Sequence, residues 1–292
     1  MSATQTTAEI TETRRHRRLL ERARKREEPT RTRSVRRRYA QRLRGAWQGI
    51  RAALRRGLIE NGALGREGLA ETPGRGQFDA DTDAQTIAAF GEWLETQTER
   101  DILNRFGGEN RFVTRAYERG VEDAQTELNA LEMSQGRAGA TALRLPAHRE
   151  RLESLYARHR TELEGMTDTV ATDCRRELSE GLAADESPRA IAEGRLADVI
   201  GRVEDGSPTG AMNSATLLAG AVLMTATNAA RATEWERAGV QKVGLLIASD
   251  ACPQCQALKA GEPYLVSDAR SLVPGRTHPN CRCSVHVWTD SS

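Results

Sequence analysis

The sequence has few aromatic residues and almost no lysine. Aromatic residues make up 4% of its 292 residues, and three lysines stand against 40 arginines. A chain with so few large side chains builds modest hydrophobic cores, which is more typical of long packed helices than of a compact enzyme. Charged residues reach 29%, which favours helices with extended polar surfaces.

The sequence also lacks the patterns of export and membrane insertion. No apolar run precedes the charges of residues 1–18, so a secretory signal is not predicted there. Residues 206–230 contain no charged side chain, but Asn213, Thr216 and Asn228 interrupt the apolar surface. Each of these polar groups would need a partner in lipid. We therefore expect a buried core helix in a soluble protein without a membrane partner.

Motifs of common enzymes are missing as well. The sequence contains no G-x-S-x-G nucleophile turn, no phosphate-binding glycine loop and no H-E-x-x-H metal motif. We therefore expect no enzymatic activity and assign no catalytic residue.

Charge is distributed unevenly along the chain. Residues 1–60 carry a net charge of +12, and residues 61–292 carry −10. A basic arm on an acidic body indicates a polyanionic partner. The alternative is that the arginines simply form the solvated face of a helix. Apolar residues recur at helical spacing in this arm and need an apolar partner. They are Val35, Tyr39, Leu43, Trp47, Ile50, Leu54 and Leu58. The candidate contact residues for nucleic acid or another partner are Arg36, Arg37, Arg38, Arg42 and Trp47.

The middle of the chain has the periodicity of packed helices. Residues 61–82 are rich in glycine and predict a linker, after which the helical body spans residues 83–239. Helices are predicted over residues 83–106, 112–131, 147–182, 188–203 and 210–238. The glycine pair Gly107-Gly108 predicts a helical hairpin between the first two.

Residues 240–292 change in character and predict a small α+β domain. Three short runs have the length of strands: Lys242–Ala248, Tyr264–Val266 and Cys283–Trp288. Alternation in the last run predicts an exposed His286. The fold class is therefore mainly α, with an elongated helical body and a small C-terminal zinc-binding α+β domain.

Four of the five cysteines lie within residues 252–283. Clustered cysteines in a chain without an export signal favour a metal over disulfides. A C-x-x-C pair, Cys252 and Cys255, precedes the run His278-Pro279-Asn280-Cys281-Arg282-Cys283. Sulfur and imidazole nitrogen are ligands of Zn²⁺, and four protein ligands make a structural site. The favoured set is Cys252, Cys255, His278 and Cys281, with Cys283 as the alternate ligand.

These motifs resemble the C-terminal hallmark of the phage Mu F-like minor head, or head-morphogenesis, protein family. The hallmark is an Asp before a C-x-x-C, a Leu-x-Gly-like turn and a later H-P-N-C-R-C. Here it matches Asp250, the two cysteines, the turn Leu258–Gly261 and residues 278–283. Residues 225–239, with Thr233-Glu234, are similar to the helix that precedes the hallmark, and the likeness covers about residues 150–292. The chain departs from the family at Ala251 and at residues 274–277.

The resemblance implies a virion protein of a tailed virus, present in a few copies. Such a protein lies near the portal inside the capsid of the mature virion. During assembly it is in the host cytoplasm. Its implied partners are the portal protein, the capsid interior and packaged double-stranded DNA, bound without sequence preference. The alternative is a zinc-ribbon nucleic-acid-binding protein, which a DNA sequence preference would indicate. A zinc hydrolase or nuclease would instead need an open metal position.

Overall fold

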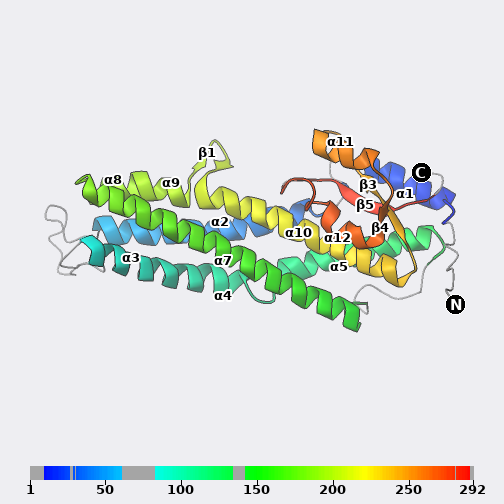
Figure 1. Ribbon diagram of the computed structural model, residues 1–292, viewed down its shortest axis with the longest axis horizontal. Coiled ribbons are helices and arrows are strands. Elements are labelled where there is room, and N and C mark those ends of the chain that lie inside the picture. The colour runs from blue at the N-terminus through cyan, green and yellow to red at the C-terminus, as the bar shows by residue number, and fades with distance from the viewer. Residues whose placement is uncertain are drawn as a thin grey trace, which may run out of the picture. The chain divides into compact units, whose positions relative to one another are not determined.

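The computed structural model describes residues 10–26, 29, 31–60, 83–133, 142–279 and 281–289. Of the described residues, 72% are in helices and 6% in strands, with a small sheet near the C-terminus (Figure 1). The predicted mainly α fold class with a small C-terminal α+β region is therefore confirmed. The predicted linker 61–82 lies outside the described residues.

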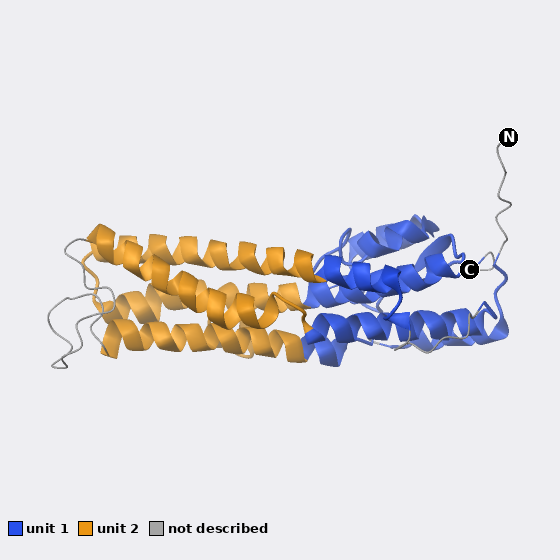
Figure 2. Ribbon diagram, turned by 90° about the horizontal axis from the view of Figure 1, so that it is seen from below, with its two compact units in different colours: residues 1–37, 111–155, 220–292 blue, residues 38–110, 156–219 orange. Residues whose placement is uncertain are grey.

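The chain forms two compact units, coloured separately in Figure 2. Unit 1 comprises residues 1–37, 111–155 and 220–292, and unit 2 comprises residues 38–110 and 156–219. These units do not coincide with the predicted arm, body and C-terminal domain. Residues 83–106 belong to unit 2 and residues 112–131 to unit 1, so the expected helical hairpin does not form a unit of its own.

Unit 2 is built from helices and one small hairpin. Its helical elements, some of them shared with unit 1, are α2 (Arg33–Arg55), a π-helical turn (Arg56–Glu60), α3 (Asp83–Thr98), a π-helical turn (Glu99–Leu103), α4 (Asn104–Phe106), α7 (Pro146–Ala183), α8 (Pro188–Ala190), a π-helical turn (Ile191–Arg195), α9 (Leu196–Ile200) and α10 (Gly210–Arg237). Helices α2, α7 and α10 divide their residues between the two units. Helix α8 begins with a capping pattern, because Ser187 accepts from the Ala190 amide at 3.2 Å and Pro188 occupies the first helical position.

The apolar stripe of α2 forms part of the core of unit 2. From Tyr39 to Leu58 its large apolar residues are at most 1% exposed. The Tyr39 ring lies 6.0 Å from the ring of Phe106, and its hydroxyl shares a hydrogen bond with Nε2 of His159. Asn110 donates to the same hydroxyl at 2.9 Å. The stripe thus has its apolar partner within this chain.

The predicted helix 188–203 ends three residues early, at Ile200. Gly201 has a φ of +101°, which lies outside the helical range, so the helix ends before it. A Cβ at this position would collide with the carbonyl of Thr209, so the position needs glycine. The hairpin β1 (Val203–Glu204) and β2 (Ser207–Pro208) follows. Its turn residues Asp205 and Gly206 both have positive φ, as a tight two-residue hairpin requires.

Unit 1 combines helices with a three-stranded antiparallel sheet of order β4-β3-β5. Besides its shares of α7 and α10, its elements are α1 (Arg14–Arg24), α5 (Arg111–Ala130), β3 (Lys242–Leu246), α11 (Pro253–Ala260), β4 (Tyr264–Leu265), a 3-10 turn (Val266–Asp268), α12 (Ala269–Leu272) and β5 (Ser284–Val287). Strand β3 pairs Val243 with Val287 and Leu246 with Ser284, so the three predicted strands are confirmed with slightly shorter bounds.

Close helix packing supports this sheet. A Cβ on Gly120 of α5 would lie 2.7 Å from Cβ of Ala230 on α10, so glycine permits the approach of the two helices. Trp235 of α10 is fully buried in the same hydrophobic cluster as Val243 and Val285. The predicted burial of this helix, whose residues up to Ala230 carry no charge, is therefore confirmed. None of the described helices is both long and apolar enough to span a bilayer.

Helix α1 packs against the sheet and closes its second face. Leu20 and Ala23 of α1 form a small apolar cluster with Leu246 of β3 (Figure 1). Strand β5 is therefore buried along its whole length, and His286 is only 1% exposed. The prediction of an outward, exposed His286 is wrong, because alternation assumes a sheet with one face in water.

Candidate metal centre

The first half of the site is the N-terminus of α11. Cys252 is the extended N-cap residue, with φ −66° and ψ 163°, and Pro253 occupies the first helical position. Proline there has the φ that a helix needs and lacks an amide that would go unpaired. The Gln256 amide donates to the Cys252 carbonyl at 3.1 Å and closes the turn. This turn brings Sγ of Cys252 and Sγ of Cys255 to 3.5 Å.

The second half is the turn that leads into β5. The Cys281 amide donates to the His278 carbonyl at 2.9 Å, which folds the chain back between these two residues. Cys283 follows directly before β5, and its sulfur accepts from the Ala248 amide at 3.4 Å. The pairing of β3 with β5 thus holds the two cysteine segments side by side.

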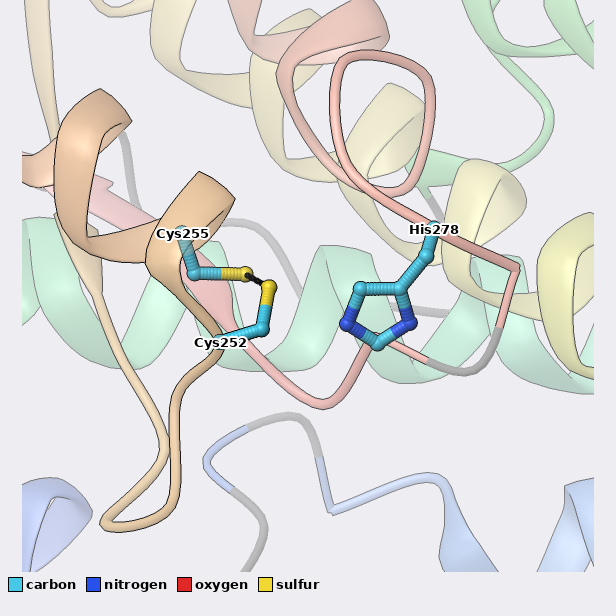
Figure 3. Close-up of side chains that lie close together, drawn as sticks. All are labelled: Cys252, Cys255 and His278. Carbon is cyan, nitrogen blue, oxygen red and sulfur yellow. Dashed lines mark hydrogen bonds between the residues drawn. The ribbon is translucent and has the colours of Figure 1, made fainter.

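The five candidate ligands form one cluster that can hold a metal ion. The ligand atoms of Cys252, Cys255 and His278 lie within 4.8 Å of one another, and so do those of Cys255, Cys281 and Cys283. Figure 3 shows the imidazole of His278 facing the two sulfurs of the C-x-x-C turn. Cys255 belongs to both groups and lies 3.5 Å from the Cys281 sulfur.

The sulfur spacing fits a tetrahedral ion. Four ligands at ~2.3 Å from a central zinc stand roughly 3.8 Å apart, so both measured separations are close to a tetrahedral edge. The favoured set of Cys252, Cys255, His278 and Cys281 and the alternate Cys283 therefore all lie where they can contribute. Five donors are available for four positions.

Burial and hydrogen bonding shift the pKa values of the thiols in opposite directions. The hydrogen bond from Cys283 lowers the pKa of Cys281 to about 5. Burial raises the pKa of Cys255 to about 12, and the bond to Cys281, with burial, raises the pKa of Cys283. Buried thiols that compete for protons in this way suit a divalent cation, which replaces those protons when it binds.

An ion pair ties the two halves of the site together. Arg282, between Cys281 and Cys283, donates to the carboxylate of Asp250, two residues before Cys252. This bond holds the pKa of Asp250 below its ordinary value. The sequence places Asp250 and Arg282 within the same motif, but nothing in it indicates that the two side chains pair.

The candidate contact residues of the basic arm are not gathered into one site. Arg37, Arg38 and Arg42 are exposed and Arg36 is half-buried. Trp47 is fully buried, so its assignment as a partner contact is wrong. The side chain packs in the core of unit 2, because its apolar stripe is covered by helices of the same chain.

Comparison of the chain with family models, with curated proteins and with solved structures finds no match.

Proposed function

We propose that this chain is a minor head, or head-morphogenesis, protein of a tailed virus. The observation that carries the proposal is the motif around the cluster: Asp250, the Cys252–Cys255 pair and the run from His278 to Cys283. Its members converge in space, and Arg282 of the run pairs with Asp250. This convergence supports a reading of the motif as one functional module.

Within this proposal the cluster is a structural zinc site. The donor set of thiols and one imidazole suits Zn²⁺ better than the hard cations that prefer oxygen. Four protein ligands would fill the coordination sphere, so the ion would cross-link α11 to the start of β5. The strands of the sheet are only two to five residues long. Small elements of this kind commonly depend on a metal for stability.

The proposed location is the interior of the capsid near the portal, in several copies. There the protein assists head assembly and contacts packaged double-stranded DNA without sequence preference. Exposed Arg37, Arg38 and Arg42 support the DNA contact, since arginines on a helix surface can neutralise phosphates.

Deletion of the gene from its virus tests the proposed role. Heads assembled without this chain are expected to package less DNA or to lose infectivity, and a plasmid copy should restore both. Normal yields of infectious particles from the deletion strain would reject the role. High-affinity binding to one DNA sequence, with no effect on heads, would instead favour the zinc-ribbon alternative.

A further inference from the structure

Unit 1 contains a cavity that is distinct from the cysteine cluster. It measures about 410 Å³ and is lined by residues of α1, α5, α10, β3 and β5. The five candidate metal ligands are not among its lining residues. Its volume lies within the range of pockets that hold small organic ligands.

The lining is rich in arginine, and its acidic groups are already paired. Six arginines line the cavity together with Asp123 and Glu127. Asp123 accepts from Arg231 at 2.8 Å and from Arg31 at 3.3 Å. Glu127 accepts from the Val287 amide at 2.9 Å and lies 3.0 Å from Nε2 of His16. Neither carboxylate is therefore free to neutralise the remaining arginines.

Four arginines of α1 and the turn after it supply the unbalanced charge. Arg15, Arg18 and Arg22 follow one another at steps of three and four, which places them on the same side of α1, and Arg26 lies two residues beyond the end of that helix. All four are exposed, and no carboxylate of the described residues pairs with them. A row of this kind attracts an anion to the mouth of the cavity.

The inner wall has a different chemistry. Leu246 and Val285 contribute apolar surface. Nδ1 of His286 donates to the Val287 carbonyl at 2.8 Å, so the neutral ring presents Nε2 as an acceptor. That Nε2 is buried and has no hydrogen-bond partner among the described residues. The cavity thus combines anion-binding donors with apolar surface.

We propose that this cavity binds the phosphate group of a nucleotide. Guanidinium groups bind phosphate oxygens in pairs, and the apolar wall fits a base. Both a free nucleotide and the phosphorylated end of a DNA strand present this chemistry. The inference does not depend on the proposed viral function.

Isothermal titration of the full chain tests the site with three phosphate-bearing probes and one control. The probes are deoxyadenosine 5′-monophosphate, inorganic phosphate and a short duplex with 5′-phosphates, and the control is the same duplex without them. We expect the mononucleotide, the phosphorylated duplex or both to bind more tightly than inorganic phosphate. The double substitution Arg18→Gln/Arg22→Gln should weaken that binding by about tenfold or more, because it removes charge-assisted hydrogen bonds.

The matched control is Arg14→Gln/Arg24→Gln. Both residues are exposed on α1 and do not line the cavity, so the change in charge is identical. Binding of the mononucleotide identifies a free nucleotide as the ligand source, whereas binding of the phosphorylated duplex alone identifies a strand end. Equal losses in the two variants would overturn the site in favour of diffuse charge attraction. The absence of binding by all three probes would overturn it as well.

Discussion

On the proposed zinc site, replacement of Cys255 by alanine should release the metal and unfold the C-terminal part of unit 1. Cys255 is shared by both groups of candidate ligands. Its loss breaks the favoured set of Cys252, Cys255, His278 and Cys281 and removes the sulfur that links the two groups. The four remaining donors would have to close around the ion without that shared sulfur.

The expected loss of stability in Cys255→Ala exceeds that of an ordinary core substitution. Structural zinc contributes about 10–16 kcal/mol of apparent binding free energy in small peptide sites. A whole domain is stable by only about 5–15 kcal/mol. The sheet beside the cluster has strands of two to five residues, so little else can replace the cross-link. The helices of unit 2, which contain none of the five ligands, should remain folded.

Metal content and thermal unfolding are the two measurements. Elemental analysis gives the metal per chain, and near-ultraviolet circular dichroism follows the environment of buried Trp235 in unit 1. The control Gln254→Ala changes an exposed residue between the two cysteines and should keep both properties. Retention of one metal per chain and an unchanged melting temperature in Cys255→Ala would refute the reasoning.

Four further substitutions test the packing and the charges. Trp47→Ser should cost about 3–5 kcal/mol in urea unfolding because it empties a fully buried site, and unchanged stability would contradict that burial. Glu127→Ala should cost about 1–3 kcal/mol by leaving the Val287 amide unpaired. The exposed pair residue Glu122 should change stability by less than about 0.5 kcal/mol when replaced by alanine. Burial lowers the pKa of His159 to about 4, so the folded state binds a proton less readily than the unfolded state. The free energy of unfolding should therefore fall by up to about 3 kcal/mol as pH falls from about 6.5 toward 4. The stability difference between wild type and His159→Gln should therefore shrink on acidification, and a constant difference would argue against this linkage.

Helical periodicity predicts most of the helices, and the spacing of the cysteines and His278 predicts the candidate metal site. The stripe through Tyr39 and Leu54 is a strong signal because every third or fourth residue is large and apolar. The cysteine cluster was predictable because a C-x-x-C turn places two sulfurs together before any tertiary structure is known. The hairpin at Asp205-Gly206 also has a local signal in the sequence, because an Asp-Gly pair favours a two-residue hairpin turn.

Tertiary contacts account for the features that could not be predicted. Helix α1 is dominated by arginine, and Leu20 and Ala23, with the partly buried Leu19 beside them, anchor it on the sheet, so its sequence resembles a solvated helix. Once α1 covers the second face of β5, His286 becomes buried, although strand alternation predicts exposure. The arginine-lined cavity depends on the same contact, which no sequence period encodes.

Quantitative mass spectrometry of purified particles tests the proposed function most directly. The virus that encodes this chain should be purified as DNA-filled heads and as empty assembly intermediates. We expect peptides of this chain in the filled heads, at a few copies per particle and in constant ratio to the portal protein. Portal peptides at normal abundance without any peptide of this chain, in both heads and intermediates, would contradict its assignment as a minor head protein.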